Sequence, residues 1–258
     1  MKNIALSTAC FFPEHPEDSF KRVAPLGFDA AEVFVNTDGE TTKEYFANLK
    51  KQSEESGVKI IAIHSPYGYA EPVLFFSPYQ RRTDEALEKY ERFFENIAVF
   101  APVIFNFHGG YLTSSTVSQG VEVYALLSER AKKYGVIFCQ ENVNKYVFSA
   151  PENVKELKRQ IPDCNFTIDI KQAHRAGFSP FDVAAAMGGN VRHFHVNDFN
   201  ESCDCLLPGK GGFDLKGFCK ALENKGFSGR AVIEVYRKSF GGEEDIIAAR
   251  KYLEELKW

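Results

Sequence analysis

Residues 191–198 read Val-Arg-His-Phe-His-Val-Asn-Asp, a short run with the alternation of a β-strand that ends in polar side chains. In a strand, alternate side chains share a face, so His193 and His195 would point to the same side. Polar side chains at the end of a short apolar strand predict a functional site at that end. Three other predicted strands end in carboxylates that would complete the site.

Strand-like and helix-like patterns alternate along the whole chain, and 191–198 is the seventh of eight predicted strands. The others are 4–10, 29–36, 59–64, 103–107, 136–139, 164–168 and 231–235. The predicted helices are 16–27, 41–56, 81–100, 116–134, 150–160, 180–187, 215–225 and 243–256.

Eight strand–helix units, most of them joined by short loops, are the number found in a closed (β/α)8 barrel. We therefore expect an α/β protein in which residues 1–258 form a single TIM-barrel domain. An open, doubly wound sheet is the alternative. The first strand, however, runs into Ala-Cys-Phe-Phe-Pro at 9–13, which lacks the glycines of a dinucleotide-binding turn.

Composition excludes several classes of partner. The 31 basic and 35 acidic residues give a net charge of −4, which argues against a nucleic-acid binder. No apolar run approaches the roughly 18 residues of a membrane helix, and the N-terminus lacks the apolar core of a signal peptide. Six scattered cysteines in a chain of this size are typical of reduced thiols. We expect a cytoplasmic protein without nucleic-acid or membrane partners.

Ionisable side chains stand at the carboxyl ends of six predicted strands, where barrel active sites are built. The strand interiors beside them are apolar or small, which indicates an apolar barrel interior under a polar ring. Glu32, on the second strand, is expected to be structural or solvated. Each strand-end residue alone has an ordinary structural explanation, but the set as a whole predicts a site: His64, His108, Glu141, Asp169, His195 and Glu234.

Three carboxylates close together raise one another's pKa unless a cation neutralises them. Carboxylate oxygens with a single imidazole suit Mn²⁺, Mg²⁺ or Co²⁺, with Zn²⁺ the less favoured alternative. The strand ends therefore predict one divalent metal ion.

Seven short motifs, in order along nearly the whole chain, resemble those of the xylose-isomerase-like barrels of sugar isomerases, epimerases and apurinic endonucleases. They are Ile63-His64-Ser65-Pro66-Tyr67, His108-Gly109-Gly110, Glu141-Asn142, Ile168-Asp169, His195-Val196-Asn197-Asp198, Pro208-Gly209-Lys210-Gly211 and Ile233-Glu234. The resemblance implies that Glu141, Asp169, His195 and Glu234 hold one metal ion. It also implies that Glu141 and Glu234 serve as acid and base.

Two departures from the family pattern argue against an apurinic endonuclease. Gln172 stands where the endonuclease branch has a zinc-binding histidine, and where ketose 3-epimerases have a histidine that contacts substrate. Cys203-Asp204-Cys205 replaces an Asp-x-His element of the endonucleases.

The expected function is that of a divalent-metal-dependent sugar or sugar-phosphate isomerase or epimerase. A carboxylate would remove a proton next to a metal-polarised carbonyl, and the proton would return through an enediolate. An inosose-type dehydratase and a non-catalytic, accessory sugar-binding barrel are the alternatives.

Six residues are expected to bind the carbohydrate: His64, His108, Gln172, Asn197, Lys210 and Tyr67. The histidines would orient hydroxyls or relay protons, with packing as the alternative. Lys210 would meet a phosphate or carboxylate unless it is an exposed loop lysine. Tyr67 lies on the aromatic-rich loop 65–80, whose side chains would wall the pocket or bury a contact in a homo-oligomer, a dimer or tetramer.

Overall fold

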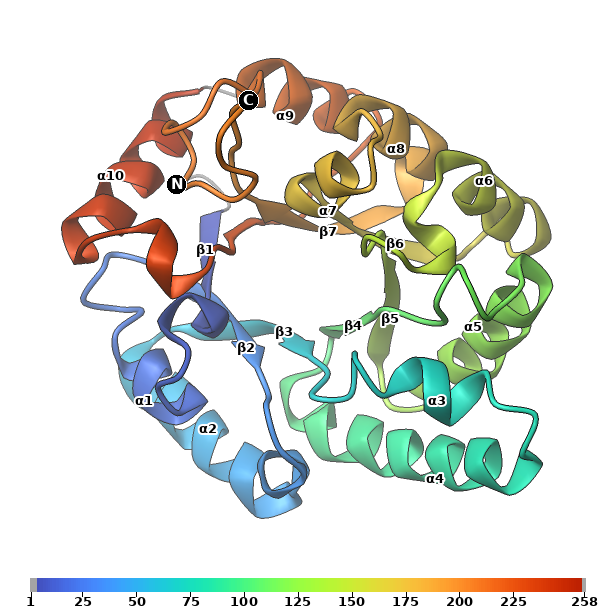
Figure 1. Cartoon of the computed structure of the whole chain (residues 1–258). Helices are drawn as coiled ribbons and strands as arrows, with labels where there is room; N and C mark the ends of the chain where they lie inside the picture. The colour runs from blue at the N-terminus through green and yellow to red at the C-terminus, as the bar shows by residue number, and fades with distance from the viewer. Residues whose placement is uncertain (1–3, 257–258) are drawn as a thin grey trace.

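The computed structural model describes residues 4–256, in which eight parallel strands close into one barrel (Figure 1). Each strand pairs with its neighbours in the sequence, and β1 also pairs with β8, so the sheet has no free edge. The (β/α)8 prediction is confirmed. The strands are β1 Ile4–Ser7, β2 Ala30–Phe34, β3 Lys59–His64, β4 Val103–Phe107, β5 Val136–Glu141, β6 Asn165–Asp169, β7 Val191–Val196 and β8 Ala231–Ile233.

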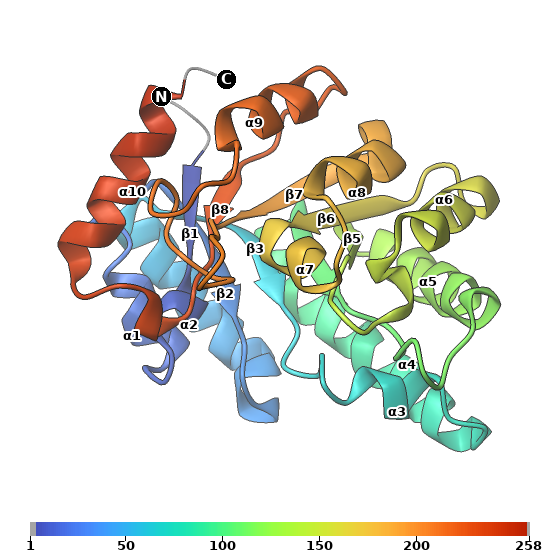
Figure 2. The same ribbon diagram turned by 45° about the horizontal axis from the view of Figure 1, so that its top comes forward.

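Helices surround the barrel, as Figures 1 and 2 show from two directions. No helix within residues 4–256 is long and apolar enough to cross a membrane. The helices are α1 Pro16–Lys21, α2 Lys43–Ser56, α3 Glu71–Phe75, α4 Gln80–Ile97, α5 Val117–Lys132, α6 Pro151–Gln160, α7 Ile170–Arg175, α8 Pro180–Met187, α9 Leu215–Glu223 and α10 Glu243–Glu255.

The main apolar core lies between the helices and the outer face of the barrel. Helix α4 buries one apolar face, on which Phe94 is fully covered. The Phe94 ring meets Phe105 of β4 edge-on at a centroid distance of 5.1 Å and Phe138 of β5 at 6.0 Å. Such edge-to-face packing adds to the stabilisation from burial. These contacts fix α4 against the strands that carry part of the site.

The inside of the barrel directly beneath the strand ends is polar, so the prediction of an apolar interior is correct only for the layer below, where Ala5, Ala30 and Val232 form a separate buried cluster. Asn106 donates to Glu32 through its Nδ2 at 2.9 Å, and the Thr167 hydroxyl donates to the side-chain oxygen Oδ1 of Asn106. His193 is also hydrogen-bonded to Glu32. Buried polar groups are tolerated where they satisfy one another. The sequence pattern missed this polar layer because the partners come from four separate strands.

Several element boundaries differ from the sequence prediction. The first strand stops at Ser7, and Thr8–Phe11 forms a 3-10 turn; the first helix ends at Lys21 instead of near residue 27. The loop 65–80 contains the short helix α3. Helix α7 was not predicted and follows β6 without a loop, because the Asp169 side chain accepts from the backbone N–H of Gln172 and caps the helix.

Replacing Phe94 by alanine tests the aromatic packing. Phe94→Ala should lower the free energy of unfolding by about 3–5 kcal/mol, because it leaves a cavity beside Phe105 and Phe138. Glu88→Ala, on the exposed face of the same helix, is the control and should change it by less than about 0.5 kcal/mol. Urea denaturation measures both variants. Equal effects would contradict the assigned core.

Candidate metal centre

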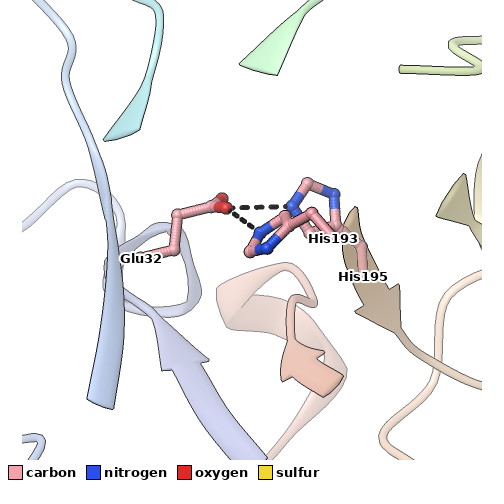
Figure 3. Close-up of side chains that lie close together, drawn as sticks. All are labelled: Glu32, His193 and His195. Atoms are coloured by element: carbon pink, nitrogen blue, oxygen red, sulfur yellow. Dashed lines mark hydrogen bonds and ion pairs between the residues drawn. The ribbon is translucent and has the colours of Figure 1, made fainter. Parts of the chain in front are cut away.

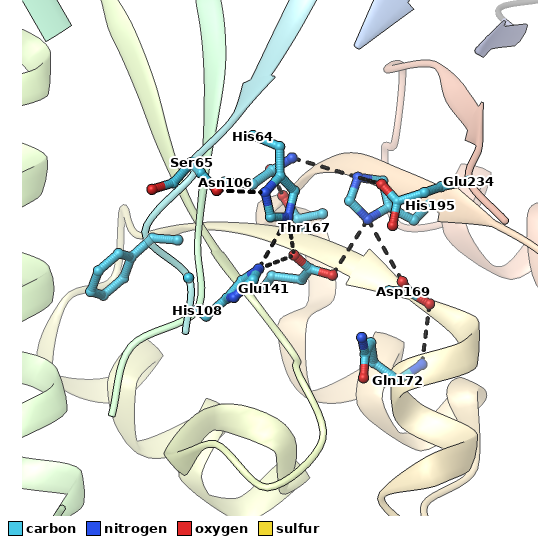
Figure 4. A network of polar contacts seen from close by, with 12 residues as sticks. His64, Ser65, Asn106, His108, Glu141, Thr167, Asp169, Gln172, His195 and Glu234 are labelled. Atoms are coloured by element: carbon cyan, nitrogen blue, oxygen red, sulfur yellow. Dashed lines mark hydrogen bonds and ion pairs between the residues drawn. The ribbon is translucent and has the colours of Figure 1, made fainter. Parts of the chain in front are cut away.

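Three of the predicted ligands meet at the carboxyl ends of adjacent strands (Figure 4). Glu141 ends β5, Asp169 ends β6, and His195 is the penultimate residue of β7. One ligand atom from each lies within 4.8 Å of the others. His195 Nδ1 is 3.4 Å from Glu141 Oε1 and 3.7 Å from Asp169 Oδ2. All three side chains are buried, so they form a compact donor set away from bulk water.

Glu234, the fourth predicted ligand, follows β8 and approaches His195 from the other edge of its ring. Its Oε2 lies 3.6 Å from His195 Nε2, whereas Glu141 faces Nδ1. Glu234 is therefore at the site but outside the three-residue group of ligand atoms. The two glutamates flank one imidazole.

Glu32 orients His195, and Figure 3 shows its carboxylate directed at both His193 and His195. Glu32 Oε2 lies 3.1 Å from His195 Nε2 and is also hydrogen-bonded to Nε2 of His193. An imidazole that donates from Nε2 to a carboxylate presents a free lone pair on Nδ1, the arrangement that metal-bound histidines use. Glu32 is thus buried and structural, never solvated, and His193 lies in the layer beneath the ligands.

Asp169 is held by two residues that the sequence placed among the substrate-binding set. Its Oδ1 accepts from Asn197 Nδ2 at 3.1 Å and from the backbone N–H of Gln172 at 3.1 Å. The Gln172 side-chain oxygen accepts a hydrogen bond from the backbone N–H of Asn144. Because Oδ1 is occupied, Oδ2 is the Asp169 oxygen that faces the cluster. Asn197 and Gln172 position this carboxylate.

His64 and His108 lie on the other side of Glu141. Their Nε2 atoms are 3.0 Å apart, and they lie 3.5 and 3.3 Å from Glu141 Oε2. Glu71 of α3, which sequence reasoning missed, accepts from the backbone N–H groups of His108 and Gly109 at 2.8 and 2.9 Å. Glu71 is fully buried and fixes the turn after β4. No local sequence signal marks it, since it lies in a loop far from β4 in the chain.

Lys171 is the second residue that sequence reasoning missed. Its Nζ lies 3.2 Å from Asp169 Oδ2 and 3.4 Å from Glu234 Oε1, and only 3% of the residue is exposed. The available signal was its position two residues after the strand-six aspartate, but a lysine in the first turn of a helix is usually solvated.

Tyr67 and Lys210 are not brought to the cluster. The Tyr67 hydroxyl donates to Asp38, and its ring packs under the ammonium of Lys89 at 4.0 Å. Lys210 is exposed in a loop, and Asp198 binds the backbone of that loop. Asp198 Oδ2 accepts from the N–H groups on either side of Lys210, those of residues 209 and 211, so the Gly-rich turn is a structural loop around Asp198.

A cavity of about 510 Å³ opens beside Glu234 and Lys171. Its walls include the aromatic side chains Phe12, Phe34 and Tyr236, and its rim carries Arg237 and Lys238; Thr8, Ala9, Glu14, Pro16, Asn36 and Val235 complete it. A smaller hollow of about 210 Å³ next to His64 and His108 shares the Phe34–Asn36 segment. A cavity of this size accommodates a small organic molecule.

The two flanking glutamates have opposite pKa shifts. Burial would raise the pKa of Glu141, but the imidazoles of His108 and His195 hold it well below its ordinary value. Burial dominates at Glu234 and raises its pKa, although His195 and Lys171 oppose this. Two neighbouring carboxyl groups whose pKa values are pushed apart can serve as base and acid.

The donor atoms fit a divalent metal ion. Among the described residues, buried side-chain atoms without a hydrogen-bond partner include Glu141 Oε2, Asp169 Oδ2, His195 Nδ1 and Glu234 Oε2. Buried carboxylate oxygens are costly without a partner. Three carboxylates with one imidazole are the ligands that Mn²⁺, Mg²⁺ or Co²⁺ accepts. Glu141, Asp169 and His195 present donors that face one another, and Glu234 would complete the set by turning from the Nε2 side of the His195 ring.

Comparison with known proteins extends over nearly the whole chain. An uncharacterised protein of Mycobacterium bovis, Mb0509, is 24% identical, covering 92% of this chain and 89% of its own. A D-psicose 3-epimerase of Enterocloster bolteae is 23% identical, covering 83% of this chain and 75% of its own. The crystal structure of a D-tagatose 3-epimerase-like protein superposes with a TM-score of 0.81 at 21% identity, covering 99% of this chain and 97% of that one.

The family model described as "Xylose isomerase-like TIM barrel" matches residues 20–257. This span includes seven of the eight strands and all four proposed metal ligands. The chain belongs to the xylose isomerase-like TIM barrel family.

Proposed function

We propose that the protein is a divalent-metal-dependent isomerase or epimerase that acts on a sugar or sugar phosphate. The observation that carries the proposal is the placement of Glu141 and Glu234 on opposite edges of His195, with Glu234 opening onto the 510 Å³ cavity. The relatives named D-psicose 3-epimerase and D-tagatose 3-epimerase-like protein support a carbohydrate substrate.

Glu141, Asp169, His195 and Glu234 would hold Mn²⁺, Mg²⁺ or Co²⁺. When bound, such an ion acts as a Lewis acid that makes the C–H next to a carbonyl more acidic. Asn197 and Gln172 keep Asp169 Oδ2 turned to the ligand set, and Glu32 keeps His195 Nδ1 turned to it. The protein thus prepares the donor atoms before substrate arrives.

The two glutamates supply the proton transfers. Glu141, whose pKa is low, is charged and accepts the proton from the substrate carbon, and the electron pair of that C–H bond delocalises into an enediolate. Glu234, whose pKa is raised, returns a proton to carbon. Return to the opposite face of the same carbon gives an epimer, and return to the neighbouring carbon gives an isomer. The roles exchange in the reverse direction.

The walls of the cavity suit a sugar. Phe12, Phe34 and Tyr236 present rings on which the C–H face of a sugar can pack, while its hydroxyls face the polar floor. His64 and His108 line the adjoining hollow and would bond hydroxyls there. Covering the reacting carbon with rings also keeps water from the enediolate.

Deuterium exchange tests the reaction. The Mn²⁺-loaded protein, incubated in D₂O with a panel of ketoses, aldoses and their phosphates, should place deuterium next to the carbonyl of at least one sugar. Glu141→Gln and Glu234→Gln should each lower incorporation by about 10²–10⁴-fold, because each removes an acid–base group. Glu44→Gln, on the exposed surface of α2, is the control and should incorporate like wild type. Absence of deuterium from every sugar would refute the proposal.

Metal analysis tests the ligand set. The purified protein reconstituted with Mn²⁺ should bind about one ion per chain, and Asp169→Asn should lose most of it. Chelation should lower the thermal midpoint of wild type, since a ligand that binds only the folded state stabilises it. The midpoint of Asp169→Asn should not respond to chelator. A variant that keeps a full equivalent of metal would show that Asp169 is not a ligand.

The affinity for metal should rise with pH. Burial opposes a charge on His195, but Glu234 and Glu32 outweigh it and raise the pKa of His195 well above its ordinary value. Without metal the imidazole therefore keeps its proton at neutral pH, and the proton must leave before Nδ1 can bind an ion. Between pH 6 and 8 the affinity for Mn²⁺ should increase by up to about tenfold per pH unit. Calorimetric titrations in buffers of different ionisation enthalpy would count the released protons, and a pH-independent affinity would contradict this assignment.

A further inference from the structure

Lys171 is a buried cation that the acid–base chemistry of Glu141 and Glu234 does not use. It belongs to the first turn of α7, and the helix is fixed to the end of β6 by the Asp169 cap. The backbone position of Lys171 is therefore set by a proposed metal ligand. Its Nζ contacts Asp169 Oδ2 at 3.2 Å and Glu234 Oε1 at 3.4 Å.

The Lys171 ammonium still has a donor to offer. An ammonium has three N–H donors, and one of them is used in the hydrogen bond to Glu234 Oε1, while Asp169 Oδ2 is an ion-pair partner at 3.2 Å. Among residues 4–256 no third hydrogen-bond acceptor contacts Nζ; the ring of Tyr236 lies 5.3 Å away. Lys171 lines the 510 Å³ cavity together with Glu234. A substrate oxygen that enters the cavity beside Glu234 thus meets an available N–H donor.

Tyr236 and Arg175 keep Lys171 in place from the solvent side. Arg175 donates to the Tyr236 hydroxyl at 2.7 Å and pairs with Asp204. Tyr236 itself is a wall of the cavity. Lys171 is almost fully buried, and it lines the cavity that substrate would occupy.

Charge balance favours a catalytic use of the lysine. With Glu234 holding the proton that it returns, Glu141 and Asp169 carry two negative charges and a divalent ion supplies two positive charges. Lys171 then leaves the centre with one positive charge before reaction, which favours binding of an anion. A buried ion pair seldom stabilises a fold more than apolar side chains of the same volume do. A buried lysine beside a substrate-sized cavity therefore points to a role in the reaction.

We infer that Lys171 is a substrate-contacting residue whose ammonium donates its free hydrogen bond to the substrate oxygen that becomes negative when the neighbouring C–H bond is broken. No bond to nitrogen forms, and no proton leaves the lysine. The substrate class that fits is a carbonyl compound with an adjacent hydroxyl, because its enediolate places the charged oxygens beside the proton-accepting carboxylate. The inference rests on the proposed function for the identity of the reaction, but the contact with an oxyanion can be measured without turnover.

The experiment compares Lys171→Met with Lys158→Met, a matched control. Lys158 is a half-buried lysine that makes one hydrogen bond, to the backbone oxygen of Met187, in another part of the barrel. Both Mn²⁺-loaded variants are titrated with acetohydroxamate, whose ionised form is a small planar anion with two oxygens. Lys171→Met should bind it about 10- to 100-fold more weakly than wild type, the usual effect of losing a hydrogen bond to a charged group. Lys158→Met should bind it like wild type.

Deuterium exchange into sugar provides the second readout. Lys171→Met should lower the rate constant kcat for exchange by about 10²–10³-fold, as the loss of an oxyanion donor does, with the stoichiometry of Mn²⁺ unchanged. A merely structural role would lower metal content or folded fraction instead. Should Lys171→Met fail to fold, Lys171→Gln replaces it, and the ¹⁵N ammonium signal of Lys171 in Mg²⁺-loaded wild type should shift on addition of acetohydroxamate.

The outcomes separate the two proposals. If wild type exchanges deuterium but Lys171→Met matches it in kcat and in hydroxamate affinity, the inference about Lys171 is wrong and the proposed function stands. If wild type exchanges no sugar but binds hydroxamate in a Lys171-dependent way, the oxyanion contact stands and the proposed function fails. Equal hydroxamate affinity in all three proteins, absence of binding included, overturns the inference.

Discussion

Buried carboxylates gathered around one imidazole are the constraint on which the rest of this structure depends. Glu32, Glu141, Asp169 and Glu234 all lie within 4 Å of a ring nitrogen of His195. Negative charges at such separations repel strongly when water is absent. Each of them therefore has a compensating partner supplied by a different element: His193 and Asn106 for Glu32, the histidine pair for Glu141, Asn197 for Asp169, and Lys171 for Glu234.

The layer of the barrel interior directly beneath His195 is polar for the same reason. A layer of apolar side chains beneath His195 would leave its Nε2 without an acceptor and its orientation undetermined. Glu32, tied to Asn106 and His193, supplies that acceptor and turns Nδ1 toward Glu141 and Asp169. Stability comes instead from the apolar packing outside the barrel, where the rings of α4 cover β4 and β5. Because the packing outside the barrel supplies the stability, the side chains beneath His195 can be polar.

Two loops are held by buried carboxylates that contact none of the proposed metal ligands. Glu71 binds the backbone after β4, and Asp198 binds four backbone N–H groups, three of them in the turn and loop 209–213. At Gly211 a Cβ atom would lie 2.3 Å from Asp198 Oδ1, so this close approach requires glycine. The loops that meet at the cavity, by contrast, follow β1, β2 and β8. The proposed substrate cavity is therefore shaped mainly by these three loops.

The sequence by itself determined the eightfold alternation of strands and helices, and with it the barrel and the edge at which the site would lie. It also placed Glu141, Asp169, His195 and Glu234 at that edge, because strand ends are local features and parallel strands bring them together. Only the tertiary structure decided what each polar side chain does there. Asn197 and Gln172 hold Asp169 in position. Tyr67 and Lys210, by contrast, lie away from the cluster. Glu32, Glu71 and Lys171 are buried. The physical reason is that burial and pairing depend on neighbours from distant strands and loops, whereas periodicity depends only on neighbours along the chain.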